Sequence, residues 1–180
     1  LLACISCFFV NNLSLMQNPE SWGRYFDHPQ GLLLNIDDPS FIPRFLHFMI
    51  GAVAIGGLAI AVYFHWRRPQ GEQTADNWII SGCRWFSGAT LLNMGVGLWF
   101  FLSLPGDILS TAHPQGWPLL LALAGGVALS VPAVTYGLAA RVIPTLLCTI
   151  GALALMLLAR SLLRTALRGP WFSVSQLPVI

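Results

Sequence analysis

The chain has 180 residues, of which 56% are hydrophobic and 9% are charged, and its mean hydropathy is +0.69. A soluble domain of this length does not tolerate so apolar a composition, so we expect an integral membrane protein in contact with the lipid bilayer. The net charge of +2 indicates no nucleic-acid partner.

The first apolar run covers about residues 1–12, roughly half of a membrane crossing. It has no basic region and no small-residue cleavage site before Asn11, so a signal peptide is the less favoured interpretation. We interpret the run as a partial helix whose earlier part is missing. Residues 13–40 are rich in turn formers, which predicts an outer loop with a short interfacial helix around Trp22.

Four full membrane crossings are expected after this loop. The first is preceded by Asp38 and Pro39, an acidic residue and a proline of the kind found where helices begin. The apolar stretches that predict the crossings cover residues 41–66, 78–104, 117–140 and 142–165. The predicted fold class is therefore all-α: one polytopic transmembrane helix bundle, with four full crossings and a partial N-terminal helix.

The arginines near the crossing ends are nearly balanced between the two sides of the membrane. Only the short loops give a preference, because arginines on short loops favour the cytoplasmic side. They place Arg67 inside and His47 towards the outside.

Arg44 and His47 lie three residues apart near the start of the first full crossing, so they share one helical face. An ionisable side chain inside a membrane span is a candidate for function. His47 could bind a haem iron while the Arg44 guanidinium pairs with a haem propionate. On the same face, Gly51 and Ala54 leave space for a flat macrocycle or for a closely packed helix. The alternative is a histidine hydrogen-bonded to a neighbouring helix, beside an arginine that reaches the lipid head groups.

A haem that transfers electrons usually has a second axial ligand at a similar depth. His65 is 18 residues further along the same helix, roughly 27 Å away, and does not qualify. Met94 lies ten residues before Leu104, and His47 lies nine residues after Asp38, so their depths match. We therefore predict His47 and Met94 as metal ligands of a low-spin haem b, with gap-filling packing as the alternative role of Met94. The chain has no CxxCH motif, so it is not expected to carry a covalent c-type haem.

Two segments carry a resemblance to a known family. LMQNPESW at Leu15–Trp22 and PRFLHFMIGAVAIGGLAIAVYFHWR at Pro43–Arg67 resemble subunit I of the cytochrome bd-type quinol oxidases. The following segment, CRWFSGATLLNMGVGLWFFLSLPGD at residues 83–107, is similar in position to that family's next crossing, which also ends in a Gly-Asp pair. The resemblance covers about half of the chain. It implies that His47 corresponds to a haem b histidine and Arg44 to the basic residue beside it.

The resemblance is partial in ways that bear on activity. The family's helix ending in MQNP is the fourth, so its high-spin haem ligands would lie on earlier crossings. Its long quinol-binding loop is replaced here by about a dozen residues, and its methionine ligand lies on a later helix. The oxygen-reducing chemistry is therefore not carried over. The prediction of Met94 as a haem ligand rests only on its depth in the membrane.

These observations lead us to expect a haem b-containing subunit of a respiratory electron-transfer complex in a bacterial or archaeal cytoplasmic membrane. It would exchange electrons between quinol or quinone and a partner cytochrome, for which a c-type cytochrome is one expectation. Gln17, Trp22 and Arg44 would line the outer haem edge or a quinol pocket. The alternative is a cofactor-free anchor subunit of a redox complex. A small-solute transporter is disfavoured because no predicted crossing carries an acidic residue.

Overall fold

Every regular element in the described part of the chain is helical. The computed structural model describes residues 1–17, 19–27, 30, 34–68, 74–104, 106 and 114–168. Asp107, the second residue of the Gly-Asp pair, lies outside these ranges. The elements are α1 (Leu2–Gln17), the 3-10 helix η1 (Pro19–Tyr25), α2 (Phe41–Arg67), α3 (Ala75–Leu102), α5 (Gly116–Leu138) and α6 (Val142–Arg168). The predicted all-α fold class is confirmed.

Four of these helices are long and apolar enough to cross a membrane. They are α2, α3, α5 and α6, with 27, 28, 23 and 27 residues. At 1.5 Å per residue each exceeds the roughly 30 Å hydrocarbon core of a bilayer. The helix α1 is also apolar but shorter, with 16 residues. The chain is a multi-pass membrane protein.

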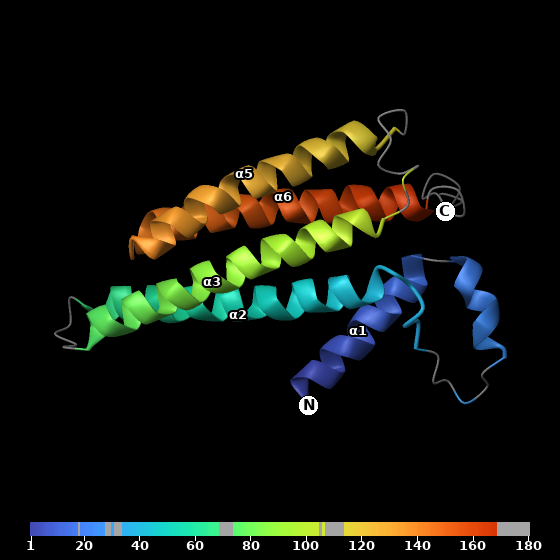
Figure 1. Cartoon of the computed structure of the whole chain (residues 1–180), viewed down its shortest axis with the longest axis horizontal. Helices are drawn as coiled ribbons and strands as arrows, with labels where there is room; N and C mark the ends of the chain where they lie inside the picture. The colour runs from blue at the N-terminus through green and yellow to red at the C-terminus, as the bar shows by residue number, and fades with distance from the viewer. Residues whose placement is uncertain are drawn as a thin grey trace, which may run out of the picture.

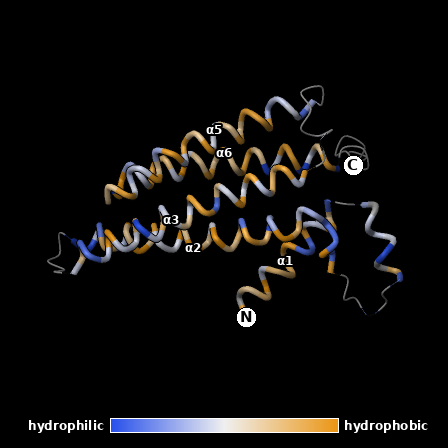
Figure 2. The backbone as a smooth tube through the Cα atoms, in the orientation of Figure 1, coloured by the Kyte–Doolittle hydropathy of each residue, from blue (hydrophilic) through white to orange (hydrophobic). Residues whose placement is uncertain are grey.

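The four spanning helices form two antiparallel pairs, α2 with α3 and α5 with α6, and α3 also contacts α5 (Figure 1). We call the end of the bundle at which α2 and α5 begin the His47 end, and the end that holds the α5–α6 turn the Arg141 end. The helix α1 runs obliquely beside α2 and finishes at the His47 end (Figure 1). Hydrophobic residues predominate along all four spanning helices (Figure 2), and many large ones are exposed, as lipid contact requires.

The helix α1 continues to Gln17, five residues beyond the predicted end, because its polar residues bind the segment before α2. The backbone N–H of Asn35 donates to Asn11 Oδ1 at 2.7 Å. The Asn35 side-chain amide donates to Ser14 Oγ at 3.0 Å, and Ser14 Oγ donates to Asp38 Oδ2. Residues that looked like a loop are therefore helical, since their partners lie 21 to 24 positions further along the chain.

The start of α2 also differs in detail from the expectation. The N-cap position belongs to Ser40, whose side chain caps no amide. Asp38 Oδ1 instead accepts the backbone N–H of Ser40 at 2.8 Å, just before the helix. Asp38 thus fixes the direction in which the chain enters α2 and links it to α1.

The helices α2 and α3 touch through their backbones at Gly57 and Gly82. A Cβ atom added to Gly82 would lie 2.6 Å from Gly57 O and 2.8 Å from Ala61 N, both backbone atoms that cannot move aside. Small residues permit this closeness, which drives helix association in lipid through van der Waals contact. The two glycines therefore set the distance between α2 and α3.

We expect Gly82→Ala to lower the free energy of unfolding by about 1–3 kcal/mol, because the added methyl group must push the two backbones apart. Gly88→Ala on the same helix is the control, since a Cβ there meets nothing within 4 Å. Thermal unfolding of both variants in detergent, followed by circular dichroism, makes the comparison. Equal stabilities would contradict the assigned contact.

Candidate functional site

Four buried side-chain atoms in the described part of the chain have no hydrogen-bond partner. They are Gln17 Oε1, Arg44 Nη1, His47 Nδ1 and Asn93 Oδ1. An unsatisfied buried polar atom costs about 1–3 kcal/mol, so each needs an explanation. All four belong to the half of the bundle nearer the His47 end. Their gathering there marks this region as the candidate site.

His47 points from α2 towards α3. Its Cε1 and Nδ1 atoms lie 3.3 and 3.4 Å from the position that a Cβ on Gly97 would occupy. The imidazole also interacts with the backbone of Asn93, one turn earlier on α3. Gly97 therefore lets the imidazole approach the α3 backbone, while Nδ1 stays without a partner.

Arg44 lies one turn closer to the membrane surface than His47, on the same face of α2. Its guanidinium carbon is 5.3 Å from the centroid of the Phe100 ring, a cation–π distance. Its Nη2 donates to Ser40 Oγ at 3.3 Å, whereas Nη1 donates to nothing. Arg44 thus keeps one buried donor free for an acceptor that the described residues do not supply.

The charge of Arg44 is only partly balanced. Asp38 attracts it and Arg160 on α6 repels it. The two ion pairs found among the described residues, Arg24 with Asp37 and Arg68 with Asp76, leave Arg44 out. This region therefore has a positive field that suits an acidic group.

Gly51 and Ala54 share the face of His47, and the sequence left open whether they admit a macrocycle or a helix. A Cβ on Gly51 would lie 3.4 Å from Asn93 Nδ2. Ala54 is 5% exposed in a cluster with Leu58, Phe86 and Ala133. In the structure, α3 packs closely on this face of α2, and Gly51 and Ala54 serve as packing residues against it.

Met94 is half-buried on α3, between Asn93 and Gly97 in sequence. Since both of these neighbours face His47 or Gly51, Met94 lies at the depth of His47 to within about one helical turn. The depth match inferred from the helix ends agrees with this contact. The imidazole itself contacts Gly97 and the Asn93 backbone.

Gln17 and Trp22 lie at the His47 end in different environments. Gln17 is the last residue of α1 and keeps a buried acceptor free. Trp22 in η1 is 53% exposed, and its Nε1 donates to Leu15 O at 2.7 Å. The Trp22 indole therefore holds η1 against α1 and presents its ring outwards.

Asn93, Phe100 and Arg160 join the site without having been predicted from the sequence, and so does the contact between Gly97 and His47. Asn93 carried a weak signal as a lone amide between apolar neighbours, and Gly97 carried one as a small residue on the helical face of Met94. Phe100 and Arg160 gave none, because their role depends on which face of α3 or α6 meets α2.

No protein-family model, curated protein or solved structure matches this chain. The resemblance to the bd-type oxidases stays a prediction, and the site is argued from its own residues.

We expect Asn93→Leu to leave the free energy of unfolding unchanged or to raise it by about 1 kcal/mol, because it removes a buried acceptor that has no partner. Asn35→Leu is the matched control. It removes an amide that is satisfied by Ser14, and should cost about 1–3 kcal/mol. Chemical unfolding of both variants in detergent tests this. An equal loss in the two variants would mean that the Asn93 amide is structural.

Proposed function

We propose that this chain is a haem b-bearing subunit of a respiratory electron-transfer complex. It exchanges electrons between quinol or quinone and a partner cytochrome, in a bacterial or archaeal cytoplasmic membrane. The observation that carries the proposal is the pair formed by His47 Nδ1 and Arg44 Nη1, two buried nitrogen atoms without partners on one face of α2. One is a metal-ligating atom and the other a donor for an acidic group.

The donor set fits a b-type haem. His47 supplies an imidazole nitrogen for the iron, and Arg44 supplies a cation one turn closer to the surface, where propionates would lie. Met94 supplies a thioether at the depth of His47, and a His/Met ligand pair raises a haem's reduction potential. The haem would supply one-electron transfer, and the protein would fix its orientation and its charge environment.

The packing of the α2 face that carries His47 limits where a haem could bind. Because α3 packs on Gly51 and Ala54, these two residues are unsuited to line a macrocycle. The favoured direction is therefore towards the surface from His47, where Arg44 and Phe100 lie.

A quinol head group needs hydrogen-bond partners near the membrane surface. Gln17 offers a buried carbonyl oxygen without a donor, and Arg44 offers a free N–H. Trp22 adds an exposed aromatic ring at the same end of the bundle. These three side chains are our proposed contacts for quinol or for the outer haem edge.

The second candidate function is a cofactor-free anchor subunit of a redox complex. The observation that favours it is the packing of α3 on the face of Gly51 and Ala54. In that case the interaction of His47 with the Asn93 backbone is its whole role, and Arg44 serves only to position α2 at the head groups.

A pyridine haemochrome spectrum of the purified protein separates the two functions. We expect a b-type signal of about one haem per chain, and its loss in His47→Ala, because the iron loses its imidazole ligand. His65→Ala is the control, since it changes a histidine of the same helix at the Arg141 end and should keep the signal. A wild-type protein without b-type haem would exclude the haem-bearing function.

The role of Met94 is tested by the reduction potential of the bound haem. We expect Met94→Leu to keep the haem but to lower its midpoint potential by on the order of 0.1 V, since axial ligands move haem potentials over about 0.8 V. Met156→Leu is the control, because it makes the same substitution on α6 beside Gly126, outside the site, and should keep the wild-type potential. If both variants keep the wild-type potential, Met94 is a packing residue.

A further inference from the structure

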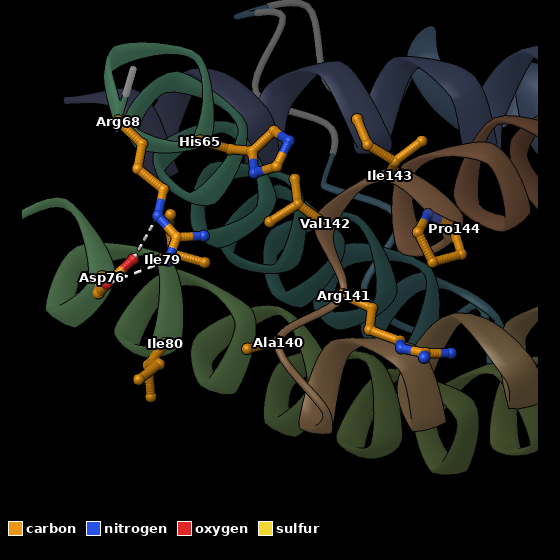
Figure 3. Close-up of a pocket in the computed structure, with 10 residues that line it drawn as sticks. All are labelled: His65, Arg68, Asp76, Ile79, Ile80, Ala140, Arg141, Val142, Ile143 and Pro144. Atoms are coloured by element: carbon orange, nitrogen blue, oxygen red, sulfur yellow. Dashed lines mark hydrogen bonds and ion pairs between the residues drawn. The ribbon is translucent and has the colours of Figure 1, made fainter. Parts of the chain in front are cut away.

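A cavity of about 570 Å³ opens at the Arg141 end of the bundle, and Figure 3 shows the residues that line it. Its wall combines the end of α2, the start of α3 and the α5–α6 turn, so the two helix pairs meet around it. Four polar residues line it, namely His65, Arg68, Asp76 and Arg141. We propose that this cavity binds a phospholipid with an anionic head group, and that Arg141 holds the phosphate.

The charges around the cavity leave one guanidinium available. Arg68 is paired with Asp76, with 3.0 Å between Nε and Oδ1 and 3.3 Å between Nη2 and Oδ2 (Figure 3). Arg141 is exposed and takes part in neither ion pair of the described residues. The cavity therefore has a net positive charge that comes from Arg141.

The start of α6 adds to this positive field. Ala140 has a φ of 53°, which turns the chain sharply from α5 into α6. The first hydrogen bond of α6 runs from Thr145 N to Arg141 O. The amides of Val142 and Ile143 precede it, and Pro144 has no N–H. The positive end of the helix dipole thus points to the side of the cavity on which Arg141 lies.

The apolar part of the wall favours a lipid over a free anion. Ile80 and Ile143 line the cavity and are 40% and 50% exposed, so their side chains can lie along an acyl chain. Between Arg68 and the start of α6, the His65 ring lies beside Val142 (Figure 3) and can donate one N–H to a head-group oxygen.

The depth of the cavity also matches a head group. Tyr63, Trp66 and Trp78 belong to the same end of the bundle and are 51%, 72% and 48% exposed. Exposed tyrosine and tryptophan gather where lipid head groups meet the hydrocarbon core. The cavity therefore lies at the level of the lipid head groups, and basic pockets between membrane helices are known to bind acidic head groups.

The test is a titration of the full, delipidated chain in detergent, with native mass spectrometry to count bound lipids. Phosphatidylglycerol and phosphatidylcholine with identical acyl chains are the probes. We expect phosphatidylglycerol to bind more tightly than phosphatidylcholine. Arg141→Gln should lower the affinity for phosphatidylglycerol about fivefold, which is the contribution expected of one arginine near an anionic membrane surface. Arg67→Gln is the matched control, an exposed arginine at the same end that does not line the cavity, and it should keep the affinity.

Three results would overturn the proposal. Equal binding of the two lipids would exclude head-group recognition, and equal losses in the two arginine variants would reduce it to general surface charge. The same protection from thermal unfolding by inorganic phosphate as by phosphatidylglycerol would assign the site to a free anion. Circular dichroism of the lipid-free variants confirms that each is folded. None of these outcomes depends on whether the chain binds haem.

Discussion

The contact between the backbones of Gly57 and Gly82 determines the geometry of the candidate site. This contact fixes the register of the antiparallel α2 and α3. Further along the pair, Ala54 lies near Phe86, Gly51 packs on Asn93 and His47 packs on Gly97. A glycine or alanine at each of these contacts lets α3 follow α2 for about ten residues on the way to the His47 end. The imidazole is therefore held against α3 by a contact that lies roughly 15 Å away along the helix.

The two ends of the bundle use their polar residues differently. At the Arg141 end, Arg68 and Asp76 satisfy each other at the surface, and such an exposed pair contributes little to stability. At the His47 end, Arg44, His47 and Asn93 carry buried atoms without partners. Those atoms lower stability unless a ligand satisfies them, which is the expected signature of a functional site.

Much of the fold follows from the sequence, because bilayer thickness forces long apolar runs into helices. The position at which α1 ends could not be predicted from the sequence. Asn11 and Ser14 resemble loop residues until the structure shows Asn35 and Asp38 as their hydrogen-bond partners. The depth match of His47 and Met94 followed from counting residues to the helix ends. The role of Asn93 could not be predicted, because many small residues could have formed the α2–α3 contact and each choice would turn a different face of α3 to His47.

A reduced-minus-oxidised absorbance spectrum of membranes that contain the full chain tests the central claim, that His47 and Arg44 form a haem site, most directly. We expect a b-type α-band that is present in the wild type and lost in His47→Ala at equal protein level. A wild-type spectrum without this band, or one that His47→Ala leaves unchanged, would contradict it.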